Sequence, residues 1–359
     1  MQRPLHVSVI EPNLPTTTAS THGQLWTYER FVQQVVACMN RCVHSTATGS
    51  LKAILQEHLA TGGKRVRVSL IYDLAIAMDV DPRSCVEVAA ACELLHNATL
   101  IHDDLQDRDR TRRGALTVWA KHGDDQAINA GDIMLMLPFT ALAEAPVAPT
   151  VRVDLMRMLS VRAAATACGQ ATEQSLLSKM TLHWSDWRQA ATGKTGQIFA
   201  IPFEALALLV GKTPAVARRI GDLATGLGIV FQAVDDVLDL YGDKGRKQIG
   251  NDLREGRVSA LVAAHLELQP EDQRSLVGLL AMPRETTGDA HVHRWAQRFL
   301  AAGTLLQIET HLEDTIVALQ QDALPNCQVL CECMVAMANR LSEPLIGLSD
   351  ESNVSRKIA

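Results

Sequence analysis

The sequence predicts an all-α protein, on the basis of its composition and the spacing of its apolar residues. Of the 359 residues, 47% are apolar and only 4% are aromatic. Alanine and leucine, which favour helices, are abundant, and long stretches contain no proline. Apolar residues such as Phe31, Val35 and Met39 recur at the spacing of a helix with one buried face. We therefore expect packed helices rather than a β architecture.

The expected helices follow one another with short breaks, most of them at glycine or proline. Thr61-Gly62-Gly63 ends one helix, and Asp81-Pro82 begins another. Pro138 either ends or bends the helix that begins near Asp125. Residues 242–257 form a charged loop punctuated by glycines. The predicted helices cover about 24–41, 51–60, 66–78, 82–107, 125–137, 150–178, 184–191, 197–210, 214–242, 258–267, 271–281, 288–319 and 326–341.

The sequence gives no sign of an internal domain boundary. It contains no repeat of fixed period, no low-complexity tract and no shift in composition. Residues 1–22 include prolines and a run of threonines, so we expect a flexible tail there and another over 346–359. We predict one all-helical domain over residues 23–345.

Charge and hydropathy exclude several classes of partner. A net charge of −6 gives no general attraction to nucleic acid or to an anionic membrane. No uninterrupted apolar run is long enough to span a bilayer, and we find no signal peptide at the start of the chain. The eight cysteines lack the paired spacings of a disulfide framework. They fit reduced thiols, which predicts a cytoplasmic protein.

Two acidic motifs of one design are the most informative feature. The first, Asp103-Asp104-Leu-Gln-Asp107, lies at the end of a predicted helix. Asp103 and Asp107 are four residues apart, so they share a helix face with their Cβ atoms roughly 5–6 Å apart. The second motif, Asp235-Asp236-Val-Leu-Asp239, repeats the arrangement. Because carboxylate oxygens suit hard divalent cations, we expect the motifs to face each other around metal ions.

Cationic segments lie close to glycines at several points of the chain. Gly62-Gly63-Lys64-Arg65-Val66-Arg67 precedes a helix, and Arg112-Arg113-Gly114 follows the first acidic motif. Glycines allow close backbone approach, and cations near a helix N-terminus can hold a phosphate. A solvated basic turn is the alternative for the first of these segments.

These motifs, in this order, resemble the trans-isoprenyl diphosphate synthases, the family of farnesyl and geranylgeranyl diphosphate synthases. The resemblance covers about residues 60–265. It implies a single large helical bundle around a central cavity, the isoprenoid synthase type I fold, usually as a homodimer. It also implies a head-to-tail prenyltransferase that condenses isopentenyl diphosphate with an allylic diphosphate and releases pyrophosphate.

The resemblance further implies roles for individual residues. The main ligands of a cluster of three Mg²⁺ ions, bound together with the diphosphate, would be Asp103, Asp107 and Asp235. The residues that ligate or support this cluster would be Asp104, Asp236 and Asp239. The allylic diphosphate would be held by Arg112, Lys194, Lys247 and Arg257. The pocket for isopentenyl diphosphate would consist of Lys64, Arg67, His96 and Arg113. The carbocation would be stabilised by Thr195 and Gln232.

Product length, in the resembled family, depends on the helical turn before the first motif. Ala98 and Thr99 are small there, which leaves the product tunnel open and implies a product longer than farnesyl, namely geranylgeranyl diphosphate. Two alternatives stay open. A class I terpene cyclase would use the same metal chemistry but would have little need for Lys64, Arg67 and Arg113. A regulatory subunit of a heteromeric synthase would share the fold, although such subunits typically lose aspartates.

Overall fold

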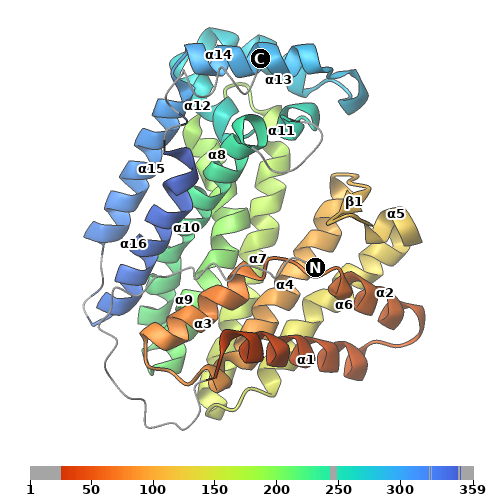
Figure 1. The fold of residues 1–359 in the computed structure, drawn as a ribbon, viewed down its shortest axis with the longest axis vertical. Helices are drawn as coiled ribbons and strands as arrows, with labels where there is room; N and C mark the ends of the chain where they lie inside the picture. The colour runs from red at the N-terminus through yellow and green to blue at the C-terminus, as the bar shows by residue number, and fades with distance from the viewer. Residues whose placement is uncertain (1–25, 243–248, 323, 325, 347, 349–359) are drawn as a thin grey trace. The chain divides into compact units, whose positions relative to one another are not determined.

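The computed structural model describes residues 26–242, 249–322, 324, 326–346 and 348, and nearly all of their regular structure is helical (Figure 1). Within these residues the only strands are β1 (Thr111–Arg112) and β2 (Ala115–Leu116). They form an antiparallel ribbon that pairs Thr111 with Leu116 and Arg112 with Ala115. The predicted all-α class is confirmed.

The helices agree closely with the expected ones. Their bounds are α1 Tyr28–Thr46, α2 Gly49–Ala60, α3 Val66–Ala77, α4 Val86–Gln106, α5 Val118–His122, α6 Asp124–Ala143, α7 Pro149–Ser175, α8 Trp184–Ala191, α9 Gln197–Leu209, α10 Pro214–Tyr241, α11 Asn251–Arg254, α12 Ala260–Leu268, α13 Gln273–Leu280, α14 Asp289–Ala301, α15 Thr304–Gln321 and α16 Gln328–Ser342. Short 3₁₀ or π turns are η1 Pro82–Cys85, η2 Leu176–Ser178, η3 Thr192–Gly196, η4 Pro270–Asp272, η5 Arg284–Thr286 and η6 Glu343–Leu345.

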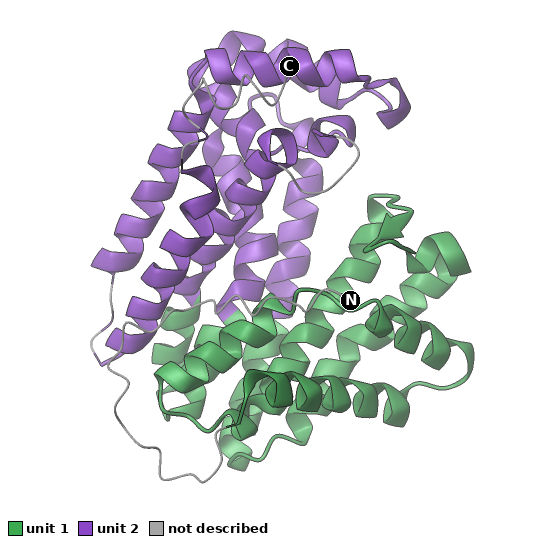
Figure 2. Ribbon diagram, viewed as in Figure 1, with its two compact units in different colours: residues 1–161, 201–221 green, residues 162–200, 222–359 purple. Residues whose placement is uncertain are grey.

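The chain forms two compact units, coloured separately in Figure 2. Unit 1 consists of Met1–Val161 and Ile201–Gly221, and unit 2 consists of Arg162–Ala200 and Asp222–Ala359. The first acidic motif therefore belongs to unit 1 and the second to unit 2.

Unit 1 is organised around α4. This helix contacts α1, α3 and α6, and it is apolar on several faces over Val86–Ala98. A helix of that kind is stable only when neighbours cover it on more than one side. The C-terminal end of α4 is less apolar and carries the first acidic motif. The same helix thus anchors the unit and presents the motif.

Unit 2 has a comparable buried helix in α12, which contacts α8 and α15. His265 of α12 is fully buried, and its Nε2 lies 2.8 Å from Asp272 Oδ2. Asp272 also forms an ion pair with Arg298 of α14. Burying a charge requires such partners, so this cluster ties α12, η4 and α14 together. None of the helices in the described part of the chain has the length and apolar character of a membrane crossing.

Three local predictions need correction. The helix expected over 288–319 is two helices, because Gly303 takes a left-handed φ of +74° between α14 and α15 and glycine adopts it without a steric penalty. The break expected after Ala191 is the single π turn η3, which continues directly into α9. Within the charged loop 242–257, Asn251–Arg254 forms the short helix α11. Pro138 lies inside α6, which continues to Ala143.

Candidate functional site

Unit 1 contains a pocket of about 460 Å³ with a cationic lining. It brings together four residues predicted to act together, which come from the turn before α3, from α3, from α4 and from the β1–β2 turn: Lys64, Arg67, His96 and Arg113. The other lining residues are Thr61, Gly63, Arg65, Val66 and Glu93. The lining includes one carboxylate, Glu93, and four cations: Lys64, Arg65, Arg67 and Arg113. This excess of positive charge attracts an anion and suits phosphate oxygens.

An ion pair holds the entrance turn of this pocket. Arg65 has a left-handed backbone, with φ +53°, immediately before α3. Its Nη1 donates to Glu93 Oε1 at 3.0 Å, and Glu93 is only 2% exposed. The pair ties the turn to α4 and so fixes the backbone that carries the Lys64 and Arg67 side chains. Sequence reasoning missed both residues, although Glu93 shares a helix face with His96, three residues later.

Gly63 leaves room for the guanidinium group of Arg113. A Cβ atom built on Gly63 would lie 2.8 Å from Arg113 Cζ, closer than a real contact allows. The φ of Gly63 is +152°, which other residues rarely adopt. A side chain at this position would therefore strain the turn, and the guanidinium group of Arg113 would have to move aside.

Two histidines of unit 1 are held in their neutral form. Burial, reinforced by the positive charge of Arg113, lowers the pKa of His58 to about 4. Burial and the charge of Arg67 lower the pKa of His96 well below its usual value. His58 Nε2 lies 3.2 Å from Asn97 Oδ1, and Asn97 in turn donates to the carbonyl of Glu93 at 2.7 Å. His96 therefore offers the pocket a neutral hydrogen-bonding group rather than a charge.

We expect the free energy of unfolding to fall as the pH is lowered from about 6.5 to about 4. The folded-state pKa of His58 is about 4, below the usual value of 6.5. The unfolded chain therefore binds the proton first and is favoured over this range. Urea denaturation at pH 7 and pH 4.5 should show a smaller pH dependence in His58→Gln. Exposed His44→Gln is the control, and an equal pH dependence in wild type and His58→Gln would contradict the prediction.

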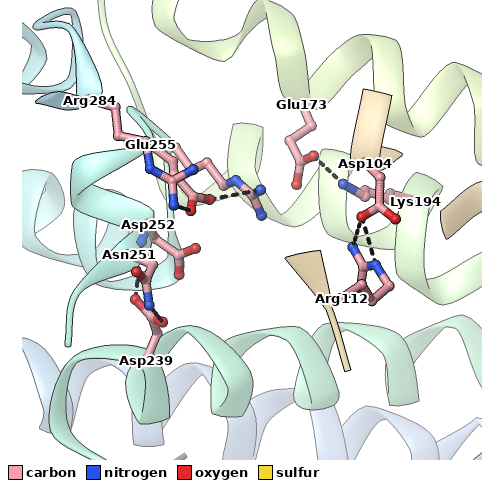
Figure 3. A network of polar contacts seen from close by, with 10 residues as sticks. Asp104, Arg112, Glu173, Lys194, Asp239, Asn251, Asp252, Glu255 and Arg284 are labelled. Atoms are coloured by element: carbon pink, nitrogen blue, oxygen red, sulfur yellow. Dashed lines mark hydrogen bonds and ion pairs between the residues drawn. The ribbon is translucent and has the colours of Figure 1, made fainter. Parts of the chain in front are cut away.

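The carboxylates of the first acidic motif differ in their surroundings. Asp104 is buried, and its Oδ1 accepts hydrogen bonds from Arg112 Nε at 2.7 Å and Nη2 at 2.6 Å (Figure 3). Burial raises the pKa of Asp104, and the bonds from Arg112 oppose that rise. Asp103 and Asp107 are only half-buried. The structure thus places Asp104 as the support of Arg112 and leaves the other two carboxylates more accessible to solvent.

The carboxylates of the second motif, on α10, also differ in burial, but here two of the three are buried. Asp235 is exposed, whereas Asp236 and Asp239 are buried. Asp236 accepts hydrogen bonds from Gln232 Nε2 at 2.8 Å, the Ala260 amide at 2.7 Å and Trp187 Nε1 at 3.2 Å. The amide of Asp252 in α11 donates to Asp239 Oδ2 at 3.1 Å, and Asn251 Nδ2 donates to Oδ1 at 3.3 Å (Figure 3).

Thr195 and Gln232, the two residues predicted to stabilise the carbocation, are hydrogen-bonded to each other. Thr195 Oγ1 donates to Gln232 Oε1 at 2.9 Å, which joins the π turn η3 to α10. Sequence reasoning missed Trp187, because nothing in the local pattern connects α8 with α10.

The predicted diphosphate-binding cations of unit 2 are paired with carboxylates. Lys194 Nζ lies 2.6 Å from Glu173 Oε2 of α7. Glu255 lies 2.8 Å from Arg257. It also lies 2.8 Å from Arg284, and both of these residues are labelled in Figure 3. Sequence reasoning missed Glu173 and Glu255. Lys247 lies outside the described residues.

Comparison with known proteins identifies the family. The model of the polyprenyl synthetase family matches residues 48–297, more than half of the chain. The chain belongs to the polyprenyl synthetase family. A geranylgeranyl diphosphate synthase of Saccharolobus solfataricus is 32% identical over 232 residues, which cover 61% of this chain and 68% of the relative. A (2E,6E)-farnesyl diphosphate synthase of Mycobacterium tuberculosis is 36% identical over 194 residues, 54% of each chain.

The fold of this polyprenyl synthetase agrees with that of its family. A crystal structure of a geranylgeranyl pyrophosphate synthase has a TM-score of 0.74 at 23% identity and covers 88% of this chain and 98% of the other. The expected fold and family are therefore confirmed. The roles predicted for single residues of the polyprenyl synthetase stay predictions.

The donor chemistry of this polyprenyl synthetase fits a magnesium ion. Asp103 lies in the last turn of α4 and Asp107 is the residue that caps its C-terminal end, and both offer carboxylate oxygens, which Mg²⁺ prefers. Within the described ranges of the chain, no three histidine, cysteine or acidic side chains form a ready metal site.

Proposed function

We propose that this chain is a head-to-tail prenyltransferase that joins isopentenyl diphosphate to an allylic diphosphate and releases pyrophosphate. The observation that carries the proposal is the cationic pocket of unit 1. An enzyme that condenses two diphosphates needs a second anion site besides its acidic motifs, and a cyclase does not. Arg67 and Arg113 can bind the diphosphate of isopentenyl diphosphate through paired N–H groups, and Lys64 adds a flexible charge.

The acidic motifs are proposed to act through Mg²⁺, three ions bound together with the allylic diphosphate. Asp103, Asp107 and Asp235 would be the main ligands. Asp104, Asp236 and Asp239 would support them, because their carboxylates already accept hydrogen bonds from the protein. When bound, the ions supply positive charge that stabilises the leaving pyrophosphate.

The remaining residues are proposed to hold the allylic diphosphate and to stabilise the carbocation that forms from it. Arg112, Lys194, Lys247 and Arg257 would hold the diphosphate, so Lys194 would exchange its contact with Glu173 for one with phosphate. The allylic C–O bond ionises, the isopentenyl double bond attacks the cation, and a proton leaves to the released pyrophosphate. Thr195 donates its hydrogen to Gln232, so its oxygen lone pairs can face the cation.

We further propose geranylgeranyl diphosphate as the product, and the geometry of α4 favours Thr99 over Ala98 in setting its length. Thr99 is half-buried and shares a helix face with His96 and Asp103. Ala98 is fully buried and shares its face with Leu94 and Ile101, which are also buried. Curated relatives include both geranylgeranyl and farnesyl synthases, so product length needs a direct test.

Phenylalanine in place of Thr99 should shorten the main product from C20 to C15, because its ring would stand one helical turn below Asp103. Mass spectrometry of products from isopentenyl and dimethylallyl diphosphate measures the change. In contrast, Ala98→Phe should mainly overpack the core and destabilise the protein by about 1–3 kcal/mol. An unchanged product in a folded Thr99→Phe variant would show that Thr99 does not line the tunnel.

Residues 23–345 are proposed to act as one prenyltransferase domain, in a cytoplasmic homodimer. Ile128 and Met136 of α6 support a dimer: they are 47% and 57% exposed and lie on one face of the helix. Exposed apolar residues of this kind are common at protein interfaces. Sedimentation equilibrium would give the mass of the assembly directly.

One incubation tests the proposed function. Purified protein is mixed with Mg²⁺, isopentenyl diphosphate and an allylic diphosphate of five, ten or fifteen carbons. Chain extension with release of pyrophosphate supports the proposal. Cyclic hydrocarbon formed from farnesyl or geranylgeranyl diphosphate alone would instead indicate a terpene cyclase. The absence of any reaction without a partner protein would indicate a regulatory subunit.

A further inference from the structure

Trp187 of α8 contacts the second acidic motif. Its side chain is 3% exposed, and its Nε1 donates to Asp236 Oδ2 at 3.2 Å. The backbone amide of Ala260, which begins α12, donates to the same oxygen at 2.7 Å. A carboxylate oxygen accepts two hydrogen bonds comfortably, so these two donors saturate Oδ2. Asp236 is thereby held from two helices at once.

The other oxygen of Asp236 orients the amide of Gln232. Gln232 Nε2 donates to Asp236 Oδ1 at 2.8 Å. Because the nitrogen of the amide points to Asp236, its oxygen points away and accepts the hydroxyl hydrogen of Thr195 at 2.9 Å. A reversed amide would place two donors against Thr195 and an oxygen against a carboxylate. The hydrogen bond from Gln232 to Asp236 thus goes with one orientation of the Gln232 amide and one direction for the Thr195 hydroxyl.

The indole of Trp187 is itself held in place. Its ring centroid lies 4.4 Å from that of Trp184 on the same helix. Trp184 also stacks on His311 of α15, with 4.2 Å between centroids and 5° between planes. His311 Nε2 lies 2.7 Å from Glu267 Oε2 of α12. Trp187 thus packs against Trp184, which is itself held by α15, and this packing restricts the direction in which the indole N–H can point.

We propose that Trp187 is a positioning residue for prenyl transfer, which acts through Asp236 and Gln232 to set the direction of the Thr195 hydroxyl. The proposal rests on the proposed function, in which Thr195 and Gln232 stabilise the carbocation. Trp187 touches neither substrate in this scheme. Its contribution should appear in the chemical step, because without the indole Asp236 still accepts the Ala260 amide and so keeps its place beside the proposed metal ligands.

The first test compares Trp187→Phe with Trp295→Phe in the full-length protein. Both changes remove a buried indole of unit 2, but Trp295 lies in the His265 cluster on α14. Trp187→Phe should lower kcat about tenfold and leave both KM values within twofold. The substitution removes one hydrogen bond to the Asp236 carboxylate and no proposed contact with either substrate. Trp295→Phe should change kcat by less than twofold. Calorimetry should show unchanged binding of pyrophosphate with Mg²⁺ in both variants.

The second test is a double-mutant cycle with Asp236→Asn. If Trp187 acts through Asp236, adding Trp187→Phe to Asp236→Asn should lower kcat by less than a further twofold. Independent, multiplicative losses would overturn the proposal. An equal loss of kcat in Trp187→Phe and Trp295→Phe would also overturn it. The same holds if the lower kcat of Trp187→Phe is accompanied by a lower melting temperature and weaker pyrophosphate binding. A wild-type protein that does not condense the substrates would overturn the proposed function and, with it, this inference.

Discussion

Asparagine in place of Asp103 should lower kcat about 10³-fold, with little change in melting temperature. The substitution removes an anionic oxygen from the half-buried end of α4, where the carboxylate is proposed to bind Mg²⁺. Charge stabilisation by a bound metal is worth several kcal/mol in the transition state, and each 1.36 kcal/mol corresponds to about tenfold in rate. Steady-state kinetics with saturating substrates measures the change, and calorimetry should show weaker binding of pyrophosphate with Mg²⁺.

The control for this variant is Asp125→Asn, which changes the net charge of unit 1 equally but lies on the exposed start of α6. Its kcat should stay within twofold of wild type. Asp104→Asn should behave differently from both, because Asp104 holds Arg112. We expect it to raise the KM for the allylic diphosphate. If Asp103→Asn retained wild-type kcat and metal-dependent binding, the assignment of Asp103 as a metal ligand would be wrong.

Glutamine in place of Arg113 should raise the KM for isopentenyl diphosphate about 100-fold and leave the KM for the allylic diphosphate within about twofold. The guanidinium group lies against Gly63 in the cationic pocket and can form two charge-assisted hydrogen bonds to phosphate. Bonds to charged groups contribute about 1.5–3 kcal/mol each, which is enough for this change. Initial rates with one substrate varied at a time separate the two KM values.

Two further variants make this result specific. Arg110→Gln removes an exposed arginine three residues away, which lies over the Trp119 ring, and it should leave both KM values unchanged. Gly63→Ala retains Arg113 but forces its guanidinium group aside, so it should also raise the KM for isopentenyl diphosphate. Equal increases in both KM values for Arg113→Gln would mean that the pocket does not distinguish the two substrates.

Much of the fold was predictable because its signals are local. Apolar spacing, glycines and prolines located most helices to within a few residues. The break at Gly303 was missed because an alanine- and leucine-rich sequence favours helix on both sides of it. Whether a single glycine continues a helix or takes a left-handed φ depends on how the two flanking helices pack, which local spacing does not contain.

The candidate site was predictable where whole motifs carry the chemistry. Lys64, Arg67, His96 and Arg113 come from separate segments, and they do line one pocket. The partners of these motifs were not predictable. Glu93 and Glu173 are single carboxylates in otherwise ordinary helices, and their pairing with Arg65 and Lys194 depends on contacts between segments distant in the chain.

The sequence alone determined that this protein is helical, that it resembles the trans-isoprenyl diphosphate synthases and that it carries two acidic motifs. Only the tertiary structure decided which carboxylates of each motif are buried and bonded to the protein, as Asp104 and Asp236 are, and which are more accessible. The reason is physical. Spacing along one helix places carboxylates on a shared face, but hydrogen bonds from other elements, such as those of Arg112 and Trp187, determine what each carboxylate can do.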